Sequence, residues 1–253
     1  LEKIINKTLS FNTPLISIDR NINILELFHG PTLAFKDFGA RFMARVMEHF
    51  VSIEGKALTI LVATSGDTGS AVASGFLGVE GIDVVILYPS KKVSDIQEKQ
   101  LTTNGENITA LEVKGNFDDC QRIVKSAFID SDVRESLNIT SANSINISRL
   151  IPQSFYYVNS SKYIDNIVFS VPSGNFGNLT AGIFAKEMGF NVSKFIASTN
   201  INDVFPKYLK SKIYQARPSI ETISNAMDVG NPSNIKRINA IFEGSVSKIN
   251  QEI

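Results

Sequence analysis

Hydrophobic positions along the chain form short, nearly continuous runs that alternate with longer amphipathic stretches. The short runs are rich in β-branched residues and predict strands at Ile24–Leu27, Ala57–Val62, Asp83–Tyr88, Ile108–Val113, Asn166–Val171 and Lys194–Ser198. The stretches between them predict helices at about residues 37–52, 67–78, 91–103, 117–130, 144–161, 177–188 and 233–243. This alternation predicts an α/β fold of mostly parallel sheets flanked by helices on both faces.

The pattern for regular structure is weakest at about residues 211–232, which include Pro218, Gly230 and Pro232. Ser233 follows this loop, and we predict that it caps the next helix.

Composition narrows the class of protein. Hydrophobic residues make up 43% of the chain and charged residues 20%, which is typical of a soluble globular protein. Lysine plus arginine and aspartate plus glutamate both number 25, so no net charge favours a nucleic acid or membrane partner. Cys120 is the only cysteine, which excludes an internal disulfide and a multi-cysteine metal site and favours a cytoplasmic location.

A strand is predicted to end in the turn Thr64-Ser65-Gly66-Asp67-Thr68-Gly69, which opens a helix of small residues. Backbone N–H groups at such a helix start can bind a carboxylate or a phosphate. The alternative is a purely structural turn with Asp67 or Thr68 as the helix cap. The turn has neither the lysine of a Walker loop nor the glycine spacing of a dinucleotide-binding motif.

A second strand is predicted to end in the loop Ser173-Gly174-Asn175-Phe176-Gly177-Asn178, and a helix follows. Two glycines allow the backbone to fold closely around an oxyanion at the helix N-terminus. A structural turn is again the alternative.

Lys36 lies between Phe35 and Phe38 at the start of a predicted helix. The helix dipole and the loss of water both disfavour its ammonium form there. A neutral amine is the form that attacks an aldehyde to make a Schiff base. Taken alone, Lys36 is also compatible with an ordinary surface lysine.

The segment "SANSINISR", residues 141–149, is dense in amides and hydroxyls. Asn143, Ser144 and Arg149 could bind a phosphate, because a guanidinium suits bidentate contact with an oxyanion. Without a phosphorylated ligand, the segment is a polar loop that enters a helix.

The segments "ELFHGPTLAFKDFG", "TSGDTG", "SANSINISR" and "VPSGNFGN" together resemble the threonine synthases, a pyridoxal-phosphate (PLP) family. The resemblance runs from about residue 20 to "NAMDVGNPSN". It implies a two-domain, fold-type-II enzyme similar to the tryptophan synthase β subunit. Residues 1–35 and 155–253 would form a larger domain for the cofactor phosphate, and residues 36–154 a smaller domain with the substrate-carboxylate turn.

The resemblance also implies roles for individual residues. Lys36 would carry PLP and act as the catalytic base, and Asp67 would lie beside the cofactor's 3-hydroxyl. The cofactor phosphate would be bound by Gly174, Asn175, Phe176, Gly177 and Asn178. The substrate carboxylate would be bound by Ser65 and Thr68, and the substrate phosphate by Asn143, Ser144 and Arg149. No metal is implied.

The implied reaction converts O-phospho-L-homoserine and water to L-threonine and phosphate, the last step of threonine biosynthesis. The alternatives are a related PLP-dependent hydroxyamino-acid dehydratase or phospho-lyase, or a truncated, inactive chain that only binds small anions. The expected partner is a small-molecule substrate, and a monomer and a homodimer both stay open.

The chain differs from the family pattern at both ends. It begins with Leu1, the family's N-terminal portion is missing, and no C-terminal segment matches the one that faces the pyridine nitrogen. We therefore expect a truncated chain that binds PLP weakly or turns over poorly.

Overall fold

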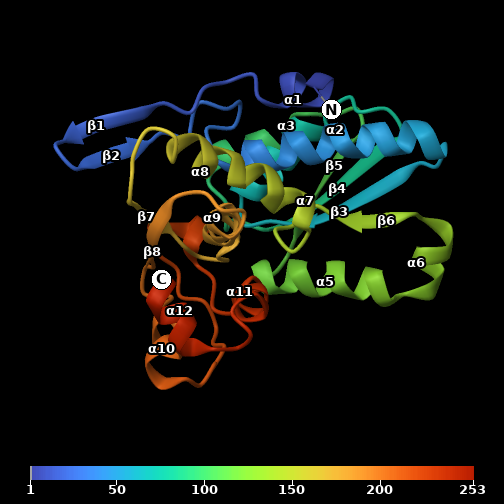
Figure 1. Cartoon of the computed structure of the whole chain (residues 1–253). Helices are drawn as coiled ribbons and strands as arrows, with labels where there is room; N and C mark the ends of the chain where they lie inside the picture. The colour runs from blue at the N-terminus through green and yellow to red at the C-terminus, as the bar shows by residue number, and fades with distance from the viewer. Residues whose placement is uncertain (1) are drawn as a thin grey trace. The chain divides into compact units, whose positions relative to one another are not determined.

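A computed structural model describes residues 2–253, which divide into two compact units (Figure 1). The first unit ends at Arg149 and the second is Leu150–Ile253. The assignment of residues 1–35 to the same domain as residues 155–253 stays a prediction, and Leu1 lies outside the described residues.

The first unit is built on a four-stranded parallel sheet with the strand order β5-β4-β3-β6. Its strands are β3 (Leu58–Ala63), β4 (Ile82–Pro89), β5 (Ile108–Val113) and β6 (Ile139–Ser141). The predicted parallel α/β architecture is confirmed here, because each strand is followed by a helix that returns the chain to the other end of the sheet.

Helices cover both faces of this sheet. Residues of α2 (Lys36–Glu54), α3 (Asp67–Phe76) and α4 (Asp95–Thr102) pack in one cluster with the strands, and residues of α5 (Phe117–Ile129) in another. The remaining helices are α1 (Glu2–Thr8), α6 (Ser131–Ser136) and α7 (Ile147–Leu150). Figure 1 shows α2 and α5 on opposite sides of β3 and β4. Ile60 of β3 packs with Phe76 and Met43 on one face, whereas Leu61 packs with Cys120 on the other. This alternation explains why the strands are apolar almost throughout.

An antiparallel hairpin of β1 (Leu15–Asp19) and β2 (Ile22–Leu25) precedes the sheet. The prediction of one strand at Ile24–Leu27 was wrong in its bounds and missed β1. The stretch "LISIDRNINIL" alternates apolar and polar residues around a short turn, which favours a local hairpin over a strand of the parallel sheet.

The second unit contains the parallel pair β7 (Ile167–Pro172) and β8 (Val192–Ser198). Its helices are η1 (Ile151–Gln153), α8 (Ser154–Ser160), α9 (Gly177–Glu187), α10 (Val204–Ser211), η2 (Asn225–Met227), α11 (Ile235–Ile241) and α12 (Val246–Glu252). The Tyr157 ring lies edge-on to the Phe169 ring, with their centroids 4.8 Å apart, and this aromatic contact ties α8 to β7.

Two local predictions in this part of the chain were wrong. The single helix predicted for residues 144–161 is divided into α7, η1 and α8, because Pro152 has no N–H for a continuous helical ladder. Ser233 does not cap α11, whose N-cap position is Asn234. Both the N–H and the hydroxyl of Ser233 donate to Asn175 Oδ1 instead, at 2.7 and 3.0 Å.

The region around residues 211–232 contains only the short η2, as its weak pattern predicts. Within residues 2–253, no helix has both the length and the apolar character needed to cross a membrane.

Candidate active site

Lys36 is the first residue of α2, after Phe35 at the N-cap position. Its side chain is only 13% exposed, and Nζ lies 3.3 Å from Asp67 Oδ2 and 5.7 Å from the centroid of the Phe35 ring. The positive end of the helix dipole and the low exposure both act against a charged amine. The Asp67 carboxylate has the opposite effect, because its negative charge stabilises the ammonium form of Lys36.

Burial lowers the pKa of Lys36 below its ordinary value, because loss of water outweighs the stabilising charge and hydrogen bond of Asp67. The positive charge of Arg149 acts in the same direction as burial. The fraction of neutral Lys36 near neutral pH is therefore larger than for an exposed lysine.

Asp67 opens α3, and its two carboxylate oxygens have different donors. Oδ2 accepts from Lys36 Nζ, and Oδ1 accepts from Gln97 Nε2 at 2.7 Å. Burial alone would raise the pKa of Asp67, but the charge of Lys36 and the hydrogen bonds from Gln97 and Lys36 bring it below the ordinary value. Asp67 is therefore ionised at neutral pH.

Thr64 organises the turn between β3 and α3. Its side chain is buried, and Oγ1 accepts from the N–H groups of Gly66 at 2.9 Å and Gly69 at 2.8 Å. Neither Asp67 nor Thr68 caps α3, since the N-cap position is Gly66, with a φ of 131° that favours glycine. An anion at this end of α3 would thus meet N–H groups other than those of Gly66 and Gly69.

Ser65 and Thr68 are half-buried residues of the same turn. The N–H of Thr68 lies in the first turn of α3, where no intrahelical acceptor exists. The turn therefore has the donors that a substrate carboxylate requires.

Arg149 is a buried cation, with its side chain in a residue only 2% exposed. Nη1 donates to the Ala142 carbonyl at 2.6 Å, whereas Nε is buried and meets no hydrogen-bond partner among the described residues. Burial lowers the pKa of Arg149 to about 10, against the influence of the Asp37 carboxylate. A buried guanidinium with an unused donor is suited to an oxyanion ligand.

Asn143 ties the loop after β6 to the end of β3. Its Nδ2 donates to the Ala63 carbonyl at 2.7 Å, and its Oδ1 accepts from the Ala63 N–H at 3.3 Å. Ser144 follows it as a half-buried residue. This contact gives Asn143 a structural role in addition to the predicted one in phosphate binding.

The predicted phosphate loop lies in the second unit, between β7 and α9. Phe176 adopts a left-handed conformation (φ 61°), and its ring packs 4.5 Å from the Phe205 ring centroid. A Cβ on Gly174 would lie 2.7 Å from Met227 Cα, so only glycine fits there. The loop therefore has a fixed shape next to the N-terminus of α9.

Gly177 and Asn178 begin α9, so their N–H groups have no intrahelical acceptor. The Asn178 Oδ1 accepts from the hydroxyl groups of Tyr156 and Tyr157, the latter at 2.8 Å. These two donors fix the orientation of the Asn178 amide, with Oδ1 toward the two tyrosine hydroxyls and Nδ2 directed away from them. The helix N-terminus and this amide group are suited to binding a phosphate.

Sequence reasoning predicted the residues of these turns, Thr64 among them, but it gave Thr64 no role and missed Gln97 and the two tyrosines. Ser94 and Gln97 form a capping box at the start of α4, a local pattern that marks a helix start. That pattern does not indicate that Gln97 reaches Asp67, because the contact depends on how α4 packs beside α3.

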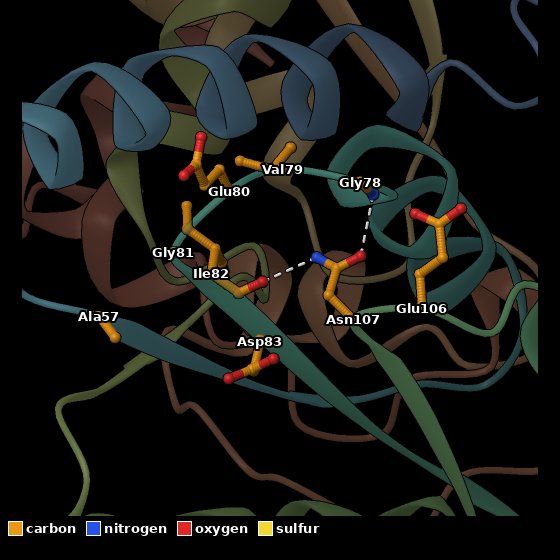
Figure 2. A pocket seen from close by; sticks show the side chains of 9 residues that line it. All are labelled: Ala57, Gly78, Val79, Glu80, Gly81, Ile82, Asp83, Glu106 and Asn107. Atoms are coloured by element: carbon orange, nitrogen blue, oxygen red, sulfur yellow. Dashed lines mark hydrogen bonds between the residues drawn. The ribbon is translucent and has the colours of Figure 1, made fainter.

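A separate cavity of about 330 Å³ lies at the amino ends of β4 and β5 (Figure 2). Its loops are joined by Asn107, which donates to the Ile82 carbonyl at 2.7 Å and accepts from the Gly78 N–H at 2.9 Å. The turn that opens α3 follows the carboxyl end of β3, so the cavity lies at the other end of the sheet. None of the predicted site residues lines it.

Comparisons with known proteins identify the relatives of this chain. Residues 8–249 match the family described as pyridoxal-phosphate dependent enzyme. A threonine synthase of Haemophilus influenzae is 50% identical over 248 residues, which are 96% of this chain and 58% of that protein.

Solved structures agree with this result. The crystal structure of threonine synthase from Escherichia coli matches 96% of this chain with a TM-score of 0.90 and 46% identity, over 57% of that chain. The PLP-bound threonine synthase of Brucella melitensis matches 98% of this chain with a TM-score of 0.88 and 38% identity, over 56% of its own length. The chain thus spans little more than half the length of these relatives.

The similarity to threonine synthases and the fold-type-II α/β fold predicted from the motifs are confirmed by these matches. The match covers both compact units and includes every predicted site residue. This chain belongs to the family of pyridoxal-phosphate dependent enzymes.

Proposed function

We propose that the protein is a threonine synthase, a lyase that converts O-phospho-L-homoserine and water to L-threonine and phosphate. Similarity to threonine synthases over 96% of the chain supports this function. The observation that carries it is the Lys36 amine, which is 13% exposed and lies 3.3 Å from the Asp67 carboxylate at a helix N-terminus. Low exposure and the helix N-terminus favour the neutral amine that the chemistry requires, and they outweigh the opposite influence of the Asp67 carboxylate.

The residues present fit PLP, the cofactor of this family. Lys36 would be the attachment residue, Asp67 would interact with the cofactor's 3-hydroxyl, and the loop from Gly174 to Asn178 would hold its phosphate. The absence of space for a side chain at Gly174 is what a close backbone cradle requires. When bound, PLP supplies an electron sink that stabilises negative charge next to the substrate's amino group.

Lys36 acts as the general base in this proposal. Its Nζ takes a proton from the substrate, which needs a neutral amine, and the lowered pKa of Lys36 increases the fraction of that form near neutral pH. Asp67 stays ionised and keeps the amine in place through the 3.3 Å contact.

The substrate is bound at its two anionic ends. Ser65 and Thr68 take its carboxylate with the backbone of their turn, and Arg149, Asn143 and Ser144 take its phosphate. Arg149 supplies the charge, because it is buried with its Nε unused among the described residues. Asn143 mainly holds the loop in position through Ala63.

Turnover of O-phospho-L-homoserine by Arg149 variants tests this proposal. Loss of a hydrogen bond to a charged group costs about 1.5–3 kcal/mol, so we expect Arg149→Ala to lower kcat/KM by at least about tenfold. Arg149→Lys retains the charge and should recover part of the loss. Arg122→Ala is the matched control, because Arg122 is 69% exposed and far from the predicted site in sequence. Thermal unfolding checks that each variant is folded.

Unchanged turnover in folded Arg149→Ala would contradict the assignment of Arg149 to the substrate phosphate. Release of an oxo acid or an unsaturated product in place of threonine would contradict the threonine synthase proposal and favour a dehydratase or phospho-lyase on the same fold. A chain that only binds small anions would show no new absorbance band with PLP. The cytoplasmic location and the monomeric or homodimeric state stay predictions.

A further inference from the structure

Gln97 connects the start of α4 to the predicted active site. It is the third residue of α4, and its Oε1 accepts from the Ser94 N–H at 3.0 Å as part of a capping box. Its Nε2 donates to Asp67 Oδ1 at 2.7 Å. One amide group thus bonds a helix end and a carboxylate at the same time, which fixes its orientation.

The turn before α3 leaves room for this side chain. A Cβ on Gly66 would lie 2.4 Å from Gln97 Cδ, so the Gln97 amide passes over the turn at the place where a side chain is absent. Gly66 therefore serves two needs, the backbone conformation at φ 131° and the passage of Gln97. The Gln97 amide is therefore held by the shape of the turn as well as by its hydrogen bonds to Ser94 and Asp67.

We propose that Gln97 is a positioning residue, whose amide holds Asp67 Oδ1 so that Oδ2 stays directed at Lys36 Nζ. The inference rests on the proposed function, because the orientation of Lys36 matters for catalysis only there. A carboxylate turns easily about its terminal torsion, which has a broad energy minimum. With Gln97 on one oxygen and Lys36 on the other, Asp67 has one favoured orientation.

The consequence for Lys36 has a definite sign. The charged groups that act on it are Asp67 from α3, which raises its pKa, and Arg149 from α7, which lowers it. If Asp67 turns away, its stabilising influence on the ammonium is weakened while burial and Arg149 remain. Removal of the Gln97 amide should therefore move the pKa of Lys36 further down.

Competitive labelling of the amine across pH, with Lys36 quantified by mass spectrometry, measures this shift. The full chain is first treated with hydroxylamine and dialysed to remove any bound carbonyl compound. Asp67→Asn removes the opposite charge and should lower the labelling midpoint of Lys36 by about one unit or more. Gln97→Met should lower it by a part of that shift, and should add nothing in the Asp67→Asn background.

Ser94→Ala is the matched control, because it breaks the other half of the capping box without touching Asp67. We expect the Ser94→Ala midpoint to equal that of the unchanged chain. Equal shifts in Gln97→Met and Ser94→Ala would overturn the inference in favour of a helix-capping role. So would a Gln97→Met shift that persists fully with Asp67→Asn.

The same preparation separates this inference from the proposed function. Labelling uses neither cofactor nor substrate, so the midpoints test Gln97 whether or not Lys36 carries PLP. Borohydride reduction with PLP, followed by peptide mapping, tests the attachment at Lys36. A midpoint shift without attachment would contradict the proposed function alone, and attachment without a shift would contradict the role of Gln97 alone.

Discussion

Thr64 provides the most quantitative prediction, because one buried oxygen organises the whole turn before α3. Its Oγ1 accepts from two N–H groups, those of Gly66 and Gly69, and donates to the Gly66 carbonyl at 3.0 Å. Thr64→Val keeps the shape of the side chain and removes all three hydrogen bonds. Thr64→Ser keeps the hydroxyl and removes only a methyl group.

The expected cost follows from which groups lose their partners. The Gly66 carbonyl still accepts from the Ser70 N–H at 3.1 Å, so it stays satisfied in Thr64→Val. The N–H groups of Gly66 and Gly69 lose their acceptor in Thr64→Val, and each unsatisfied buried group costs about 1–3 kcal/mol. With partial relaxation, we expect Thr64→Val to lower the free energy of unfolding by about 2–4 kcal/mol. Thr64→Ser should cost about 1 kcal/mol, the value of one buried methyl group.

Urea unfolding of the two variants measures the difference in stability. With an m-value of up to about 3 kcal/mol/M, the Thr64→Val midpoint should fall by about 1 M relative to the unchanged chain. Amide hydrogen exchange gives the local readout, because the Gly66 and Gly69 amides should be protected in Thr64→Ser and exposed in Thr64→Val. Equal stability of the two variants, with both amides still protected in Thr64→Val, would refute this account of the turn.

Three further predictions address other parts of the chain. Gly174→Ala places a Cβ 2.7 Å from Met227 Cα, so the loop must shift, and PLP titration should show at least about tenfold weaker binding, equal to a cost of about 1.4 kcal/mol. Tyr157→Phe removes one of two donors to Asn178 and should lower the free energy of unfolding by about 1 kcal/mol, measured in urea. Burial raises the pKa of Cys120 to about 11, so the folded chain retains the thiol proton to a higher pH than the unfolded chain does. Unfolding experiments should therefore show the free energy of unfolding falling between about pH 9 and 11. Cys120→Ala should lose that part of the pH dependence.

The sequence predicts the elements whose signals are local. The strands β3, β5 and β7 are short apolar runs that end at glycine-containing turns. The start of α2 at Lys36 follows from a turn before a helical pattern. The two candidate anion-binding turns were recognised for the same reason, since glycine, serine and threonine between a strand and a helix lie within a few residues of one another.

Features that depend on packing between distant segments were not predictable from the sequence. Ser233 has the right chemistry for a helix cap, but Asn175, which lies 58 residues away, accepts its hydrogen bonds. Gln97 lies 30 residues from Asp67, and nothing local signals that the two meet. The flanking phenylalanines predicted that Lys36 loses water, and motif resemblance supplied its assignment, whereas its contact with Asp67 required three-dimensional structure.

Attachment of PLP to Lys36 distinguishes the proposed enzyme from a protein that only binds small anions, and peptide mapping tests that attachment. The protein is incubated with PLP, reduced with borohydride and digested, and the modified lysine is identified by peptide mapping. We predict that the label lies on Lys36 and disappears in Lys36→Ala. A label on another lysine, or none in the folded protein, would contradict the claim.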